Sequence, residues 1–439
     1  MPLLVLLFQL QVAGAVPTAP VTPPTTAPAA PPAAATETLT LEQAVGAALA
    51  HHPDVVVAGA QTEIARAGAR QARAPLLPQL GVTGRYGYQW RDTGDDEFGD
   101  GGGSDSFSAT ASGNLLLWDF GQTRNRWRSA LAASDAANQD AETVRQGIVL
   151  NARLAFLDAL ETSQLIQVAR ETLDNQSSHL SQTEEFVKLG TRPEIDLAKL
   201  RTQVAQARAA LTRAENDHRT AKARLNRAMG VSGSIEYEVA PTEFPALAEE
   251  SQTTAHLYNS SRRSERASQV ASIRGQEADV RAARTWLLPS LRLGADAGYG
   301  GTDFADPIFS TSVGVTLSWN LFDGLASPAA ADSARAQLVV QQARLSSVDQ
   351  QVWQEIEEAR IGVASSRAEL ESAVLAVESA RELRRLAEER YTAGVGNSLE
   401  LSDAQLELAN AAAQHVRVQF DVAAARAQLL RALGRRDWR

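Results

Sequence analysis

The sequence lacks several features that mark common classes of protein. It contains no cysteine, which excludes disulfide bonds, thiolate metal sites, thiol catalysis and lipid attachment through an N-terminal cysteine. Lysine and arginine number 42 against 52 aspartate and glutamate, a net charge of −10, which argues against a nucleic-acid partner. No apolar run reaches the roughly 18 residues that a membrane-spanning helix requires, although strands of a β-barrel are not excluded. Only 5% of residues are aromatic, which suits closely packed helices better than one thick core.

Motifs for catalysis and metal binding are also missing. The sequence has no Gly-x-Ser-x-Gly nucleophile motif and no Walker A loop, and its six histidines show no metal-ligand spacing. The triplet Asp119-Phe120-Gly121 stands without the other motifs of a kinase, and we interpret it as a junction between a strand and a helix. The acidic, Gly-rich stretch 92–105 could bind calcium, but it lacks the EF-hand spacing and better fits a solvated external loop. We therefore expect no enzymatic activity, no cofactor and no metal site.

The N-terminus has the pattern of an export signal followed by a tether. An apolar stretch at residues 3–12 precedes Ala13-Gly14-Ala15, which has the small-x-small form of a signal-peptidase site. The positive residues that usually begin such a signal are missing, so a buried apolar N-terminus is the alternative. We assign residues 1–15 as a signal peptide. Residues 16–36 consist only of Pro, Ala, Thr and Val, which predicts an extended linker.

The remaining chain is predicted to contain two copies of one structural unit. Similar segments recur 204 residues apart, around the pairs Gly190 and Gly394, Gly230 and Gly434, and Asp119 and Asp323. We place a first structural repeat at residues 37–234, an equatorial connection at 235–252 and a second structural repeat at 253–439. Each repeat is expected to consist of a helix, a β-hairpin, a very long helix and a further helix.

The hydrophobic period supports this order of elements. Thr40 and Gln43 have the spacing of a capping box and open a predicted helix of about 35 residues. Apolar and polar residues then alternate at 80–90 and 107–117, which predicts a hairpin with one apolar and one polar face; the second repeat keeps the same phase at 291–299 and 313–318. Helical patterns fill 122–189, 194–229, 326–393 and 399–433. At 1.5 Å per residue, each of the two longest would span roughly 100 Å.

These strands predict an assembly of several copies. Four strands cannot close into a membrane barrel, since the smallest known has about eight and open edges are not viable in lipid. Two copies would give eight strands filled by side chains, and three would give twelve, wide enough for a lumen. The alternative is a soluble coiled-coil protein whose alternating segments are small hairpins.

The duplicated layout resembles the TolC-type outer-membrane efflux proteins. The resemblance covers about residues 38–434 and rests on the opening Leu39-Thr-Leu-Glu-Gln-Ala-Val, the Leu77-Pro78 strand entry, Trp118-Asp-Phe-Gly121 and the turns at Gly190 and Gly394. It implies an α+β homotrimer in the outer-membrane lipid, with a twelve-stranded β-barrel continued by a periplasmic α-helical barrel. It also implies docking to a periplasmic adaptor and to an inner-membrane pump that supplies the energy. Drugs, metal ions, small molecules and secreted polypeptides are the substrates of such systems.

The resemblance also implies a gate near the helix-hairpin tips. Glu400 and Asp403 fall on the acidic-ring positions, and their i, i+3 spacing puts both carboxylates on one helical face. An equally strong interpretation is that Asn397 and Glu400 simply cap the helix, whose first turn favours acids. Tyr391 and Asp196 match two members of the family's lock.

The resemblance assigns the rest of the lock and the adaptor contacts less directly. The lock's arginine position holds Gly396 here, which leaves the charged half of the lock unassigned; Arg192 lies in the other hairpin. We expect the adaptor to meet the tips, at Gly190, Thr191, Arg192, Gly394, Asn397 and Ser398.

The predicted function is therefore a passive exit duct of a tripartite efflux or type I secretion system. A periplasmic coiled-coil scaffold or adhesin without transport activity is the alternative.

Overall fold

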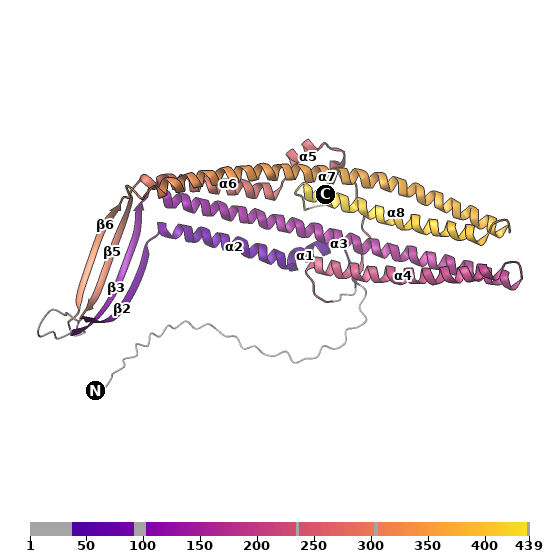
Figure 1. Ribbon diagram of the computed structural model, residues 1–439, viewed down its shortest axis with the longest axis horizontal. Coiled ribbons are helices and arrows are strands. Elements are labelled where there is room, and N and C mark those ends of the chain that lie inside the picture. Colours follow the sequence, from indigo (N-terminus) through magenta and orange to yellow (C-terminus); the bar gives the residue numbers. More distant parts are fainter. Residues whose placement is uncertain (1–36, 92–101, 234–236, 303–305, 437–439) are drawn as a thin grey trace, which may run out of the picture.

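The computed structural model describes residues 37–91, 102–233, 237–302 and 306–436. The predicted signal peptide and linker, and most of the loop 92–105, lie outside these residues. The described part is strongly elongated, with a small sheet at one end and a helical body that extends away from it to two hairpin tips (Figure 1). Of the described helices, none has the length and apolar character needed to cross a membrane.

The sheet contains four antiparallel strands in the order β2-β3-β5-β6. Their bounds are Gln79–Arg91, Gly102–Trp118, Ser290–Gly301 and Ile308–Ser318. The register pairs Leu80 with Gly113, Gly113 with Ala295 and Ala295 with Val313. The predicted apolar phase is therefore confirmed, because this register places the apolar positions of all four strands on one face of the sheet.

That apolar face is bare within the single chain. Leu80 is 88% exposed, Val82 83% and Val313 77%, and no described helix packs on the sheet. Such a continuous apolar surface is typical of a face that meets lipid or another protein.

The helical body is built around two helices of 67 residues each, α3 (Gln122–Lys188) and α7 (Ala326–Thr392). In the half near the sheet, α2 (Pro53–Arg73) packs on α3, and α6 (Ser264–Ala283) packs between α3 and α7. In the half near the tips, α4 (Glu194–Met229) packs on α3, and α8 (Ser398–Ala432) packs between α3 and α7. The bounds predicted for α3, α4, α7 and α8 differ from the observed bounds by at most one residue at each end.

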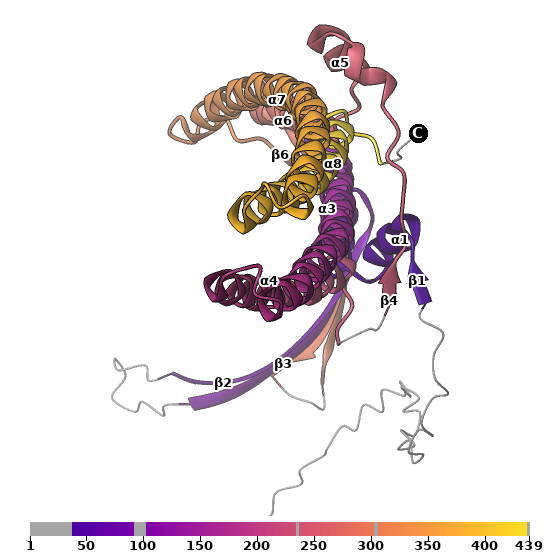
Figure 2. The ribbon, with the colours of Figure 1, turned by 90° about the vertical axis from the view of Figure 1, so that its right-hand side faces the viewer.

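The body is thus a single layer, four helices wide along its whole length. The layer is curved, and α1, α5, β1 and β4 lie on its convex side (Figure 2). The remaining short elements are β1 (Glu37–Leu39), β4 (Tyr237–Val239), α5 (Thr254–Ser260) and the 3-10 turns η1 (Ala74–Leu76), η2 (Ala248–Ser251) and η3 (Arg284–Leu287).

The predicted first helix of about 35 residues is wrong in one respect, because it is broken in two. The capping box of Thr40 and Gln43 is present and opens α1 (Leu41–His51). Pro53 then cannot donate a backbone hydrogen bond to this helix, and His52 turns the chain out of helical geometry. Helix α2 begins at Pro53, with the His52 side chain accepting from the Asp54 amide at 3.2 Å.

The middle of the body is fixed by a hydrophobic core and an ionic network. The core joins Phe156 of α3 and Leu225 of α4, both fully buried, to partners on α1, α8 and β4. Beside it, the buried Arg263 donates to Glu355 at 2.6 Å and to Glu265 at 3.1 Å. These contacts hold α6 against α7, so the layer keeps its width where the two halves meet.

Candidate functional site at the hairpin tips

Two tight turns form the end of the body that lies farthest from the sheet. Gly190 and Gly394 follow α3 and α7 with φ of +73° and +76°, a conformation that glycine adopts without steric cost. The Gly190 amide donates to Val187 O at 3.0 Å, and the Gly394 amide donates to Tyr391 O at 3.1 Å. Each glycine therefore ends a long helix and sends the chain back along it.

Tyr391 lies at the centre of the contact between the two hairpins. Its side chain is only 2% exposed, and its hydroxyl lies 3.0 Å from Thr183 Oγ1 on α3. The ring packs edge-on against His179, with 4.9 Å between centroids, and against Phe186 at 6.4 Å. The tyrosine of the predicted lock is therefore a buried anchor between α3 and α7.

Arg192 reaches this anchor from the other hairpin. Its guanidinium lies 4.5 Å from the centroid of the Tyr391 ring, close enough for a cation–π contact. It also donates to Gly396 O at 3.3 Å and, at 3.5 Å, lies at the limit of a hydrogen bond to Tyr391 O. The sequence comparison left the lock without an arginine, and in the structure Arg192 brings its charge to that same place.

Gly396 lies at the position that matches the arginine of the predicted lock, and the turn leaves little room there for a side chain. A Cβ there would lie 3.0 Å from Arg390 Cβ and 3.0 Å from the Tyr391 amide nitrogen. A larger residue would fit only if these neighbours shifted by a few tenths of an ångström. Asp196, the predicted lock aspartate, is half-buried in the first turn of α4, and within the described residues no hydrogen bond joins it to Tyr391.

The two residues of the predicted acidic pair, Glu400 and Asp403, lie in different surroundings. Asn397 Oδ1 accepts from the Glu400 amide at 2.7 Å, so the capping interpretation is correct for the backbone of this turn. The Glu400 carboxylate lies 2.9 Å from Arg390 Nε across the hairpin, and both side chains are exposed. Asp403, one turn later, is exposed and has no ion-pair partner among the described residues.

Most of the predicted adaptor contacts are accessible at the tips. Gly190, Thr191, Gly394 and Asn397 are exposed, and Arg192 is half-buried. Ser398 is the exception, since it is only 4% exposed in the single chain and offers little surface.

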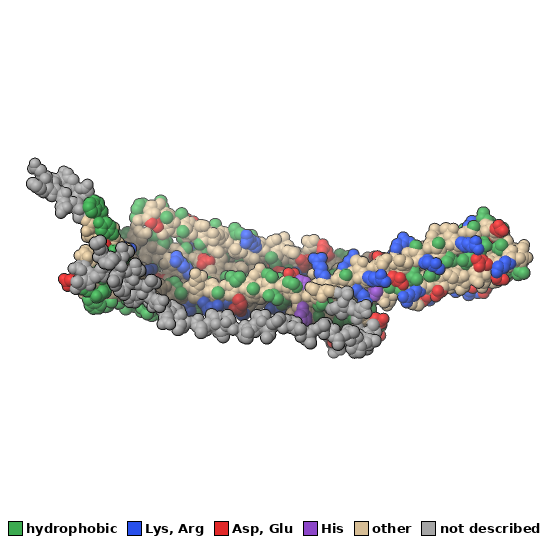
Figure 3. All heavy atoms as spheres, turned by 90° about the horizontal axis from the view of Figure 1, so that it is seen from below, with side chains coloured by type: hydrophobic (Ala, Val, Ile, Leu, Met, Phe, Trp, Pro, Cys, Tyr) green, Lys and Arg blue, Asp and Glu red, His purple; other side chains and the backbone are tan. Residues whose placement is uncertain are grey.

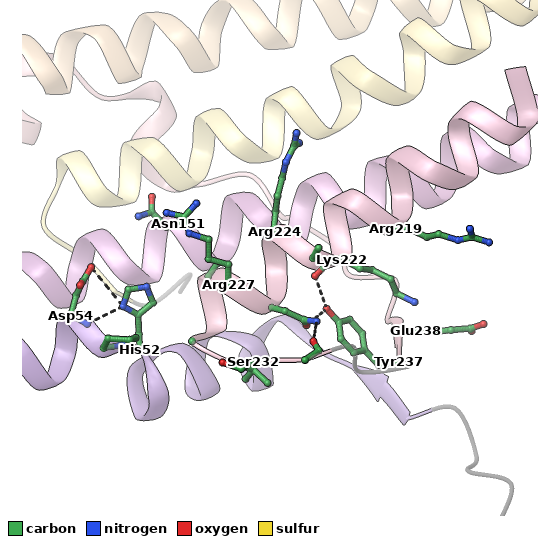
Figure 4. A pocket seen from close by; sticks show the side chains of 17 residues that line it. His52, Asp54, Asn151, Arg219, Lys222, Arg224, Arg227, Ser232, Tyr237 and Glu238 are labelled. Carbon is green, nitrogen blue, oxygen red and sulfur yellow. Dashed lines mark hydrogen bonds and ion pairs between the residues drawn. The ribbon is translucent and has the colours of Figure 1, made fainter.

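A second polar feature lies at the equator, where α4 ends against the α1–α2 break (Figure 4). It is an open groove of about 1390 Å³ whose basic lining residues are His52, Arg219, Lys222, Arg224 and Arg227. On its floor the Tyr237 hydroxyl donates to Asn226 Oδ1 at 2.9 Å, and burial raises the pKa of Tyr237 to about 12. Sequence reasoning missed this groove, although the run of cations at the end of α4 is visible in the sequence. Among the described residues, no cluster of His, Asp and Glu is arranged to hold a metal ion.

Comparison with known proteins identifies the family. Residues 44–231 and 260–435 match the outer membrane efflux protein family. The chain belongs to this family. This outer membrane efflux protein is 28% identical over 424 residues to the pyoverdine export outer membrane protein OpmQ of Pseudomonas putida, covering 90% of this chain and 85% of that protein.

More distant relatives are also similar, in sequence or in fold. The outer membrane protein TolC of Escherichia coli is 24% identical over 87% of this chain and 80% of its own. The outer membrane protein VceC of Vibrio cholerae has a similar fold, with a TM-score of 0.76 and 20% identity over 90% of this chain and 96% of that chain. The predicted resemblance is thus confirmed. The efflux protein resides in the outer membrane with a large periplasmic part, in a family of channel proteins rather than enzymes.

Proposed function

We propose that this efflux protein is the passive exit duct of a tripartite efflux or type I secretion system. Three copies would close a twelve-stranded barrel in the outer membrane and a helical cylinder in the periplasm. A periplasmic adaptor would dock on the tips, and an inner-membrane pump would supply both the energy and the choice of substrate.

This proposal rests on one observation: neither the sheet nor the helical body of the single chain is closed on itself. Its sheet has a bare apolar face and two unpaired outer strands, which lipid does not tolerate. Its helical body is a curved layer with free edges rather than a closed bundle (Figure 2). Further copies would complete both structures at once. The scaffold alternative accounts for neither the apolar face nor the family's channel proteins.

The two halves of the chain are proposed to be structural repeats, residues 37–234 and 253–439, joined through 235–252. Equal lengths of α3 and α7 support this division. With both repeats contributing a long helix, three copies would place six such helices around the duct.

The proposed gate lies at the tips. Three copies would stack Glu400 and Asp403 as two rings of negative charge, which favour cations and resist anions. Asp196 and Tyr391 would form the lock, and Arg192 would supply the positive charge that is missing at the position of Gly396. Closure would then depend on contacts between the hairpins rather than on any single ring.

The proposal is tested with the full-length protein extracted from the outer membrane. Native mass spectrometry should find a trimer, and planar bilayers should show a small conductance with cation preference. We expect Glu400→Ala with Asp403→Ala to raise the conductance or weaken that preference, because the rings lose their charge. A charge-matched control is Asp135→Ala with Asp140→Ala, two exposed acids of α3 in the half near the sheet. Currents equal to wild type in the tip variant would reject the gate, and a monomer would reject the duct.

A further inference from the structure

The polar face of the sheet is the surface that would line the lumen of the proposed barrel, because the apolar face turns to lipid. The register places every second residue of β2, β3, β5 and β6 on this polar face. Most of its side chains are short and uncharged, as at Gly81, Ser108, Gly294 and Ser312. The tip half of the helical body is different, since charged side chains of both signs are interspersed over it (Figure 3).

Two described arginines interrupt this uncharged wall. Arg85 of β2 pairs with Ser108, and Arg292 of β5 pairs with Thr316, so both arginines belong to the polar face. Both side chains are exposed, and neither has an ion-pair partner among the described residues. Because their neighbours on the wall are short, these two long side chains would extend farthest into the lumen.

Closing the barrel would not neutralise these arginines. In the strand order β2-β3-β5-β6, β2 of one copy would pair with β6 of the next copy. Strand β6 contains no charged residue, so no register of that seam places an acid of β6 beside Arg85. Asp296 of β5 is the one acid on the polar face among the described strand residues. It lies four residues from Arg292 on the same strand, roughly 13 Å away, which is too far for an ion pair.

The pairing also gives the order of these charges along the barrel. Arg85 pairs with Ser108, which pairs with Gly300 of β5, eight residues beyond Arg292. Asp296 lies halfway between Arg292 and Gly300, and with strands tilted by roughly 40° each half spans about 10 Å along the barrel axis. The same tilt shifts β2 against β5 by roughly 6 Å, which is too little to change the order. Three copies would therefore form a ring of Arg292 near the helical body, then a ring of Asp296, then a ring of Arg85.

This order of charges suits the passage of anions. The guanidinium of arginine is a planar fork that donates two parallel hydrogen bonds to a carboxylate, phosphate or sulfate group. At physiological ionic strength charges more than about 8 Å apart are largely screened, so each ring would act on the group beside it. A site on a conduction path must bind strongly enough to admit its ligand and weakly enough to release it. The ring of Asp296 would repel an anion from the space between the two arginine rings and so favour its release.

We propose that Arg85 and Arg292 of three copies form two anion-binding rings in the barrel lumen, which receive the carboxylate, phosphate or sulfate groups of cargo on its way out. This inference rests on the proposed trimer and adds the class of substrate that the barrel favours. The proposed acidic gate of Glu400 and Asp403 lies at the opposite end of the molecule. The two sets of charge would therefore act on cargo at different stages of its passage.

Block of the current by a polyanion tests the rings with the full-length protein in planar bilayers. The protein is added to one chamber, where its long helical body remains, so that the outer ends of the strands open into the opposite chamber. Sucrose octasulfate, a small sugar with a sulfate on every hydroxyl, is added to that opposite chamber and should block the wild-type current. Arg85→Gln with Arg292→Gln should raise the half-blocking concentration at least about tenfold, because charge-assisted hydrogen bonds to the sulfates are lost.

Two further variants separate charge from a general disturbance of the wall. Arg85→Lys with Arg292→Lys is the matched control, because it keeps both charges and should leave the half-blocking concentration within about threefold of wild type. Asp296→Asn should lower the half-blocking concentration, because it removes the ring that repels the probe. Native mass spectrometry should find the wild-type amount of trimer in every variant.

The outcomes distinguish the rings from the duct. Wild-type currents that the probe does not block, or equal block in wild type and in the double glutamine variant, would overturn the rings and leave the duct intact. A shift of Asp296→Asn in the same direction as the glutamine variant would also overturn them. If the double glutamine variant does not assemble, Arg85→Gln and Arg292→Gln are measured singly, and no shift in either would count against the rings. The absence of any wild-type channel would overturn the proposed duct itself.

Discussion

At the scale of single residues, Arg192 is the contact that the sequence pattern did not reveal. It lies in one hairpin and acts on the other, stacking on Tyr391 and donating to Gly396 O. The family resemblance pointed to Tyr391, and the internal repeat marked both turn glycines, because each glycine follows a helix end. A contact between hairpins about 200 residues apart depends on how the helices pack, and no local period encodes that packing.

Arg192→Ala tests this contact. The change removes the cation–π stack, which is worth about 1–2 kcal/mol when partly desolvated, together with the hydrogen bond to the turn. We expect the closed-channel conductance in planar bilayers to rise, because the hairpins separate more easily. The control is Arg201→Ala, which removes an exposed ion pair to Glu184 near the same tip and should change the conductance little. Equal currents in the two variants would mean that Arg192 has no special part in closure.

We expect His179, which packs against Tyr391, to make the tips sensitive to acid. It is 3% exposed, and neither ring nitrogen has a hydrogen-bond partner among the residues that the structure describes. Burial lowers the pKa of His179; nearby Glu388 and Asp196 act in the opposite direction, and Arg192 adds to the lowering. A depressed pKa means that the unfolded chain binds this proton more readily than the folded chain. Folded-state stability should therefore fall as the pH drops below about 6.5.

The expected result is a lower midpoint of thermal unfolding at pH 5.5 than at pH 7.5, followed by circular dichroism in detergent. His179→Leu should reduce this difference, because leucine fills a similar space and binds no proton. His256→Leu is the comparison, since His256 is exposed on α5. If His179→Leu and wild type respond to pH alike, the titrating group lies elsewhere.

At the scale of elements, the junctions between strands and long helices contain a local strain. After β3 the two left-handed residues are Phe120 and Gly121, and after β6 they are Gly324 and Leu325. The glycine thus occupies opposite places in the two junctions, so each leaves one larger residue at positive φ. The aspartate before each pair compensates, since Asp119 accepts from the Thr123 amide at 2.7 Å and Asp323 accepts from the Ser327 amide at 3.0 Å.

Leu325→Gly should therefore stabilise the protein by about 1 kcal/mol, because a non-glycine residue in this conformation costs about that much. The reverse change, Gly121→Leu, should destabilise it by a similar amount. Leu321→Gly is the control, since Leu321 is equally exposed and has no positive φ. The measurement is the denaturant midpoint in detergent, and a Leu325→Gly midpoint below that of wild type would contradict the argument.

The elements also show where sequence patterns suffice. The bounds of α3, α4, α7 and α8 follow from long uninterrupted periods that end at glycine turns, and the strands follow from strict alternation. The break at His52 was missed because proline is also a favoured first residue of a helix, so the apolar period continues across it. The equatorial groove was missed because the α1–α2 break, α4 and β4 form it together.

At the scale of the whole molecule, the sheet and the helical layer each leave a different kind of surface uncovered. The sheet leaves an apolar face bare, and the helical layer is open at both sides rather than closed on itself. The first suits contact with lipid, and the second suits contact with copies of the same chain in water. The proposed trimer in the outer membrane would cover both kinds of surface.

The apolar face gives a test at this scale, because lipid distinguishes the two faces of the sheet. Val82 and Val313 lie on the bare apolar face, whereas Thr83 and Ser312 lie on the polar face. An arginine that faces lipid near the bilayer midplane costs about 2–4 kcal/mol, and one that faces a water-filled lumen costs much less. We therefore expect Val82→Arg with Val313→Arg to reduce the amount of trimer in the outer-membrane fraction strongly, and Thr83→Arg with Ser312→Arg to leave most of it. Both variants add two arginines to the same strands, so an equal loss in both would mean that the apolar face does not meet lipid.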